Sequence, residues 1–272
     1  MQGVEKWIPT ELKTRYINSL LKVGFDVLDF GSFVSPKAIP QLKDTADVLK
    51  GIELSGSDTK LLAIIANERG AEDASAFEEI TYLGFPFSIS ETFQQRNTNS
   101  SIEQSLRRVE SINNIAQKWN KQILIYISMA FGNPYGDPWS PDLASHWIDR
   151  LNESFGIQNF ALADTVGMSN VQNIESLFKM VIADFSMLSI GAHLHSTPEM
   201  AVDKLKAAFD AGCRNFDVAL YGFGGCPMAE DVLVGNVSTQ SLIEAFVDEP
   251  GSFHLDFYRL QESERIASLV FG

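Results

Sequence analysis

The sequence predicts an α/β protein built on a parallel sheet, and three observations support that class. Short apolar runs alternate along the chain with amphipathic helical patterns, which is the order of elements in βαβ units. No linker, charged block, low-complexity tract or short repeat interrupts the 272 residues, so we expect a single domain over 1–272. No glycine-rich phosphate loop follows an early strand, because "GSFVSP" stands there instead. The last observation favours a closed barrel of strand–helix units over an open, doubly wound sheet.

The elements follow in order along the chain. Seven apolar, β-branched runs are strand candidates, at 25–30, 60–66, 79–87, 122–129, 158–163, 187–194 and 213–220. Helical patterns cover 10–23, 41–51, 69–78, 101–119, 141–155, 170–184, 198–211 and 238–247. The chain thus begins with a helix, whereas a TIM (β/α)8 barrel begins with a strand. We therefore expect a TIM barrel whose first strand is missing from this chain, followed by a helical tail at about 253–272.

Composition narrows the classes of partner. The net charge of −14 argues against a generic nucleic-acid surface, and no apolar run is long enough to span a bilayer. The first ten residues resemble neither a signal peptide nor a transit peptide. The two cysteines, Cys213 and Cys226, give no disulfide framework. We expect a cytoplasmic protein without nucleic-acid or membrane partners.

Two of the four histidines stand one residue apart in "GAHLHS". Side chains alternate along a strand, so His193 and His195 share a face and their Cα atoms lie about 6–7 Å apart. The flanking Ile190, Ala192 and Leu194 would face the helices outside the barrel. Active sites of such barrels lie at the carboxyl ends of the strands, which is where this pair falls. Two imidazoles at that spacing can bind one cation, so we interpret the pair as metal ligands rather than as core histidines.

A glycine-rich stretch, "YGFGGCPMAEDVLVGN", follows the last strand candidate. Four glycines near Cys226 predict either a lid carrying a reactive thiol or an ordinary loop with a small apolar residue. Asn236 closes this stretch. It can cap the next helix, although Ser238 is an equally good cap, or offer an oxygen to the cation.

Several motifs together resemble one family. The segments "GSFVSPKAIPQ", "SETFQQRNTNSSIEQSLRR", "LADTVGM", "AHLHS" and "GFGGCPMAEDVLVGN" occur in this order. They are similar to the hydroxymethylglutaryl-CoA lyases of the DRE-TIM metallolyase superfamily, over essentially the whole chain. The resemblance implies a TIM barrel that holds Mg²⁺ or Mn²⁺ and cleaves 3-hydroxy-3-methylglutaryl-CoA, or a close analogue, to acetoacetate and acetyl-CoA in retro-Claisen fashion.

The resemblance also implies roles for particular residues. His193, His195 and Asn236 match metal ligands of the family, and Cys226, Asp164 and Asp29 match catalytic positions. The substrate-binding candidates are Gln2, Ser35, Asn97, Ser128 and Thr165. The resemblance also implies an acyl-CoA substrate as the partner and a homodimer as the assembly.

Departures from the family qualify these expectations. The family opens with a strand that carries an Arg-Asp motif, and Met1-Gln2 matches only the end of it. A misplaced start codon or a truncation would explain this. We expect the chain as given to bind divalent metal weakly and to be nearly inactive. Asp29 and Gln240 stand where the family has Glu, and Ser196 where it has Asp. The alternatives are a Claisen-condensing synthase of the same superfamily and a degenerate, inactive homologue.

Overall fold

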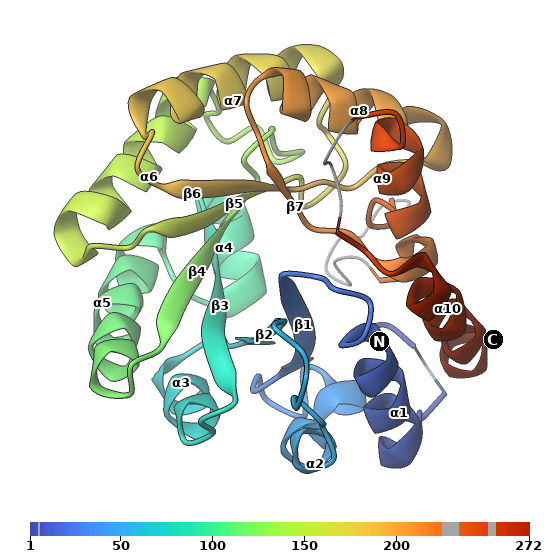
Figure 1. The fold of residues 1–272 in the computed structure, drawn as a ribbon. Helices are drawn as coiled ribbons and strands as arrows, with labels where there is room; N and C mark the ends of the chain where they lie inside the picture. Colours follow the sequence, from blue (N-terminus) through green and yellow to red (C-terminus); the bar gives the residue numbers. More distant parts are fainter. Residues whose placement is uncertain (5, 225–233, 250–253) are drawn as a thin grey trace.

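The computed structural model describes residues 1–4, 6–224, 234–249 and 254–272. Its centre is a parallel sheet of seven strands in the order β1 to β7, so that neighbours in sequence are neighbours in space (Figure 1). The strands are β1 (Val27–Ser32), β2 (Lys60–Ile64), β3 (Ile80–Ser88), β4 (Gln122–Ser128), β5 (Asn159–Ala163), β6 (Ser189–His193) and β7 (Asn215–Phe216). The seven strand candidates and their parallel order are confirmed.

Helices cover the outer side of the curled sheet, while the carboxyl ends of the strands meet at one mouth (Figure 1). They are α1 (Thr10–Leu20), α2 (Thr45–Lys50), α3 (Glu68–Ser75), α4 (Glu91–Thr98), α5 (Ile102–Lys118), α6 (Pro141–Phe155), α7 (Val171–Asp184), α8 (Pro198–Asp210), α9 (Thr239–Phe246) and α10 (Phe257–Phe271). Two short 3-10 turns, Pro40–Leu42 and Leu220–Gly222, lie in connections. Among the described residues, no helix is both long and apolar enough to cross a membrane.

Two local differences from the sequence-based elements stand out. The apolar run 213–220 forms a strand only at Asn215–Phe216, where it pairs with Gly191 and Ala192 of β6. The helix α4 was not predicted, because its sequence is polar; the Ser90 side chain accepts a hydrogen bond from Phe93 and caps it. A second helix, α5, then begins at Ile102, and its N-cap Ser101 forms a capping box with Gln104.

The main apolar core lies between the sheet and its helices. Ile190, Ala192 and Leu194 are buried in it, as the alternation of side chains predicts for residues flanking the two histidines. A second apolar cluster joins α1 to α10, with Tyr16 and Leu260 among its members. The tail thus packs as a helix against the first helix of the chain.

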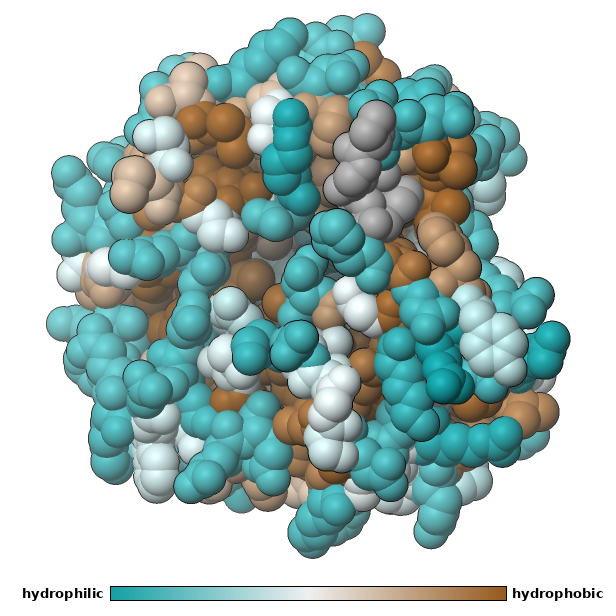
Figure 2. Space-filling view, viewed as in Figure 1, coloured by the Kyte–Doolittle hydropathy of each residue, from teal (hydrophilic) through white to brown (hydrophobic). Residues whose placement is uncertain are grey.

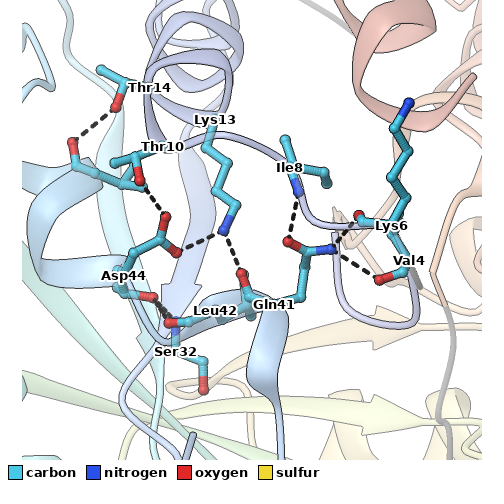
Figure 3. Close-up of polar contacts among 12 residues, drawn as sticks. Val4, Lys6, Ile8, Thr10, Lys13, Thr14, Ser32, Gln41, Leu42 and Asp44 are labelled. Atoms are coloured by element: carbon cyan, nitrogen blue, oxygen red, sulfur yellow. Dashed lines mark hydrogen bonds and ion pairs between the residues drawn. The ribbon is translucent and has the colours of Figure 1, made fainter.

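A buried polar network fixes the N-terminal segment (Figure 3). The ammonium of Lys13 on α1 donates to Asp44 Oδ1 at 2.6 Å and to the Gln41 carbonyl. Thr10 donates to the other Asp44 oxygen at 2.7 Å. The Gln41 side chain in turn accepts from the main chain of Ile8 at 3.1 Å. Lys13 therefore joins helix α1 to the connection that leads into α2, and Gln41 joins that connection to the segment before α1.

Candidate active site

The candidate site forms at the mouth, where parallel strands end together. Ser128 at the end of β4 pairs with Ala163 of β5, which pairs with His193 at the end of β6. The sheet register alone therefore brings His193 to the level of Ser128. In the space-filling view of the same side, apolar residues show toward the middle of this face, within a surround of hydrophilic side chains (Figure 2).

The two histidines face each other at this mouth. Their ring centroids lie 5.5 Å apart, with 56° between the ring planes. His195 lies just beyond β6, where its main chain forms an isolated antiparallel bridge with Asn236. The side chain of Asn236 also hydrogen-bonds with His195. Because Ser238 caps α9, accepting from Ser241 at 2.9 Å, Asn236 is not needed as a cap and stays beside the histidines.

Asp217 is a member of the site that sequence reasoning missed. Its Oδ2 lies 3.0 Å from Nδ1 of His193, so one ring nitrogen of His193 is engaged by a carboxylate. Such a pairing fixes the tautomer and ring orientation of metal-binding histidines and leaves the second nitrogen free for a ligand. The ring of Tyr126 packs edge-on against His193 at a centroid distance of 5.4 Å. The sequence places Asp217 inside the apolar run 213–220, whereas the structure ends β7 at Phe216 and puts Asp217 at a strand end, like Asp164 after β5.

The surroundings shift the pKa values of the two rings in opposite directions. Burial, together with the neighbouring His193, lowers the pKa of His195 to about 4. The ring of His195 is thus neutral at pH 7, as a metal ligand must be. Burial alone would lower the pKa of His193 too, but the hydrogen bond and charge of Asp217 outweigh it and raise that pKa.

Asp29 on β1 is a carboxylate with a raised pKa at this mouth. Although its side chain keeps accessible surface, the surrounding protein removes enough water to raise its pKa to about 7. The Met1 ammonium opposes this shift, Asp217 adds repulsion that raises the pKa further, and His193 also lowers it. A carboxyl group with this pKa exchanges its proton readily at neutral pH.

Asp164 is held differently from Asp29. It is 2% exposed, and Oδ1 accepts from the main-chain amide of Ser169 at 3.0 Å. Oδ2 accepts from the Ser169 hydroxyl and lies 3.5 Å from the ammonium of Lys204 on α8. Both of its oxygens are engaged, so the geometry suits a group that orders the site. Lys204, a second member missed from sequence, also donates to the His195 carbonyl at 2.8 Å.

The remaining substrate-binding candidates lie at different distances along the chain from the histidine site, and only some of them adjoin it. Thr165 follows Asp164, and its hydroxyl accepts from the amide of Met129, a buried residue with left-handed backbone (φ 62°) after β4. Asn97 lies half-buried on α4, Ser35 is exposed in the loop after β1, and Gln2 lies in a turn before α1. In the described structure none of these three hydrogen-bonds with the histidines. Cys226 lies outside the described residues.

The mouth holds a small set of side chains that could bind a divalent cation. Among the described residues, no three His, Cys, Asp or Glu side chains converge on a single point. The candidate donors are two imidazoles and one amide oxygen, with the carboxylates of Asp29 and Asp217 close enough to influence His193. This mixture of nitrogen and oxygen suits a divalent ion that accepts both, with carboxylate completing the preference of a hard cation.

Comparison with known proteins identifies the family. The HMGL-like family model matches residues 1–267. The chain belongs to the HMGL-like family. The hydroxymethylglutaryl-CoA lyase of Bacillus subtilis is 34% identical over 249 residues, which cover 89% of this chain and 80% of that protein.

Solved HMGL-like structures extend the match to the fold. The hydroxymethylglutaryl-CoA lyase of Pseudomonas aeruginosa superposes with a TM-score of 0.90 at 27% identity, covering 100% of this chain and 89% of that one. An HMG-CoA lyase of Acinetobacter baumannii, solved with coenzyme A and 3-methylmalate, gives 0.89 at 30% identity, covering 100% and 87%. These neighbours confirm the fold class expected from sequence, the TIM barrel, and confirm the family that the motifs resemble.

Proposed function

We propose that this chain is a divalent-metal-dependent carbon–carbon lyase that cleaves 3-hydroxy-3-methylglutaryl-CoA, or a close 3-hydroxyacyl-CoA, to acetoacetate and acetyl-CoA. One observation carries the proposal: a facing histidine pair, with Asn236 alongside, at the strand ends of an HMGL-like chain. The acyl-CoA class is supported by the relative from Acinetobacter baumannii, which was solved with coenzyme A.

The metal would be Mg²⁺ or Mn²⁺, held by His193, His195 and the amide oxygen of Asn236. When bound, such an ion polarises the hydroxyl and carbonyl oxygens of a chelating substrate as a Lewis acid. Two features favour this use of the histidines. His195 is neutral at pH 7, and Asp217 engages Nδ1 of His193, which leaves Nε2 as the ligand atom.

The chain's own residues move the protons. Asp29 accepts the proton of the substrate 3-hydroxyl, since its pKa of about 7 lets it take up and release a proton at neutral pH. The bond between C2 and C3 then breaks: the hydroxyl oxygen becomes the ketone of acetoacetate, and the electron pair passes into the enolate of acetyl-CoA. Protonation of that carbon completes the product, and the resemblance assigns the donor as Cys226.

The other candidates hold the substrate or the site. Asp164, with both oxygens engaged by Ser169 and Lys204, orders the turn beside the histidines. Ser128 and Thr165 lie at the ends of neighbouring strands and are buried next to the site, where they can contact the acyl group. Gln2, Ser35 and Asn97 stay predictions for the remainder of the acyl-CoA.

The test is a cleavage assay with 3-hydroxy-3-methylglutaryl-CoA and Mn²⁺, with and without a chelator. In a sample that carries any in-frame codons upstream of Met1, we expect chelator-sensitive release of acetoacetate, and its loss by at least a hundredfold in His193→Ala and His195→Ala; the chain as given should be nearly inactive. His146→Ala, at an exposed histidine on α6, is the matched control and should keep the parent rate. Near-normal rates in both site variants would overturn the metal assignment.

Two further measurements distinguish the lyase from a condensing synthase and from a degenerate homologue. A second sample that adds any in-frame codons upstream of Met1 tests the expected Arg-Asp strand. Consumption of acetyl-CoA with a ketoacid, in place of cleavage, would favour a condensing synthase. Absence of both reactions in both samples would favour a degenerate homologue. A cytoplasmic location and a homodimer stay predictions, which fractionation of the source cells and sedimentation of the purified chain would check.

A further inference from the structure

Lys204 is a buried lysine that takes part in no chemical step of the mechanism above. It lies on the inner face of α8, between Ala201 and Leu205, and its residue surface is 5% exposed. Lysine is almost never buried to this extent without partners, because removing an ammonium from water costs several kcal/mol. Its partners therefore show what the fold gains from placing it there.

Those partners come from two different strand ends. The ammonium donates to the main-chain carbonyl of His195 at 2.8 Å and lies 3.5 Å from the carboxylate of Asp164. The carbonyl belongs to the segment after β6, and the carboxylate to the turn after β5. Lys204 thus crosses from a helix on the outside of the sheet to both segments that build the mouth.

Each partner is fixed on its other side by groups of the site. Asp164 is anchored to Ser169 by two hydrogen bonds, so its position sets the β5–α7 turn. The main chain of His195 bridges Asn236, and the next amide, of Ser196, donates to Gly235 at 3.1 Å. Without the ammonium, a carbonyl and a carboxylate would both lose a buried donor, and the segment carrying His195 would be freer to move.

We propose that Lys204 is a positioning residue for the metal site: it holds the His195 main chain against Asp164, so that the His195 ring faces His193 and Asn236. The inference rests on the proposed function for its link to metal, but its structural half stands on the two contacts alone. Groups that orient metal-binding histidines from behind typically change metal affinity by about 10- to 100-fold. We expect Lys204 to fall within that range.

The fold supplies a matched control. Lys13 is likewise buried, likewise contacts one aspartate and one main-chain carbonyl, and its hydrogen-bond partners are Asp44 and Gln41 rather than groups of the histidine site. Lys204→Met and Lys13→Met both remove a buried ammonium while keeping an unbranched side chain of similar length. A general effect of losing a buried lysine would appear in both variants, and a positioning effect only in the first.

The experiment measures Mn²⁺ binding to the full chain by electron paramagnetic resonance. We expect the dissociation constant to rise at least tenfold in Lys204→Met and to stay within about twofold in Lys13→Met. An unchanged constant in a folded Lys204→Met protein, or equal increases in both variants, overturns the proposal. If Lys204→Met does not fold, Lys204→Gln replaces it; glutamine donates but is too short to reach both partners, so an unchanged constant there also overturns it.

Amide hydrogen exchange separates this inference from the proposed function. The reporters are the amide of Ser169, bonded to Asp164, and the amide of Ser196, bonded to Gly235. Both should exchange faster in Lys204→Met than in Lys13→Met, without any metal present. If the parent chain binds no Mn²⁺, the metal proposal fails, while exchange still decides the positioning role: equal exchange in the two variants rejects it.

Discussion

Two buried lysine–aspartate pairs lie in different parts of the molecule. Lys13 and Lys204 expose only 1% and 5% of their surfaces, so both ammonium groups have left water. The first contacts its aspartate at 2.6 Å, whereas the second lies 3.5 Å from its aspartate and bonds more closely to a main-chain carbonyl, at 2.8 Å. The same chemical pair is thus a tight ion pair in one place and a bridge between strand ends in the other.

The comparison shows that the effect of a buried lysine–aspartate pair depends on which segments of the chain its contacts join. The partners of Lys13 all belong to the N-terminal segment and the connection into α2 (Figure 3), so the pair acts on the fold. The partners of Lys204 carry His195 and order the turn at Asp164, so the pair acts on the site. Stability measurements and metal-binding measurements should therefore respond to different pairs.

The largest expected effect on stability is at Asp44. Asp44→Ala leaves the ammonium of Lys13 buried without its counter-charge, which should lower the free energy of unfolding by about 3–5 kcal/mol. Denaturant unfolding measures it. The double variant Lys13→Met, Asp44→Leu should recover most of the loss, since an apolar pair removes both charges together. If the double variant recovers less than half of the lost free energy of unfolding, the ion pair stabilises the fold more than an apolar pair does.

At Asp217 we expect a smaller effect, and one on metal affinity rather than on stability. Asp217→Ala removes the carboxylate from Nδ1 of His193, so Mn²⁺ affinity should fall by about 10- to 100-fold. The free energy of unfolding should change by less than about 1 kcal/mol, because the pair is partly exposed. Asp26→Ala, at an exposed aspartate just before β1, is the control. A large loss of stability without a loss of Mn²⁺ affinity would mean that Asp217, like Asp44, contributes to the fold rather than to metal binding.

The smallest effect concerns Asp29, a carboxylate at the mouth whose side chain keeps accessible surface. Its pKa is raised to about 7 in the folded chain, above the value of about 3.9 expected when unfolded, so folding favours the protonated form. This contribution to stability is present at low pH and is lost as the pH rises through 7. Between pH 5 and pH 8, without metal, the parent should therefore lose a few degrees of melting temperature relative to Asp29→Asn. A constant difference would contradict the raised pKa.

The helices and strands that the sequence predicted share one property, which is a regular spacing of their apolar residues. Alternation along the run 187–194 places Ile190 and Ala192 in the core and the histidines on the other face. Parallel order then brings Ser128 and His193 to one level. Residues that contact the site singly escaped this reasoning. Asp217 fell inside an apolar run taken as strand through 220, although the strand ends at Phe216.

Lys204 escaped for a related reason. In a helical pattern a lysine normally marks the solvent face, and its contacts with His195 and Asp164 depend on how α8 packs on two strands. A signal was nevertheless present, because Lys204 stands three residues after Ala201 and one before Leu205, on the apolar face of the helix. The short polar helix α4 shows the converse, since its Ser90 cap is clear but its apolar stripe is weak.

The packing of α1 on α10 has a consequence for how the protein is made. The second apolar cluster takes Tyr16 from one helix and Leu260 from the other, with roughly 240 residues of chain between the helices. At about 5–20 residues per second, a ribosome needs roughly 12–50 s to synthesise that interval. Helix α1 therefore emerges long before its partner exists, and its apolar face remains open to chaperones throughout translation.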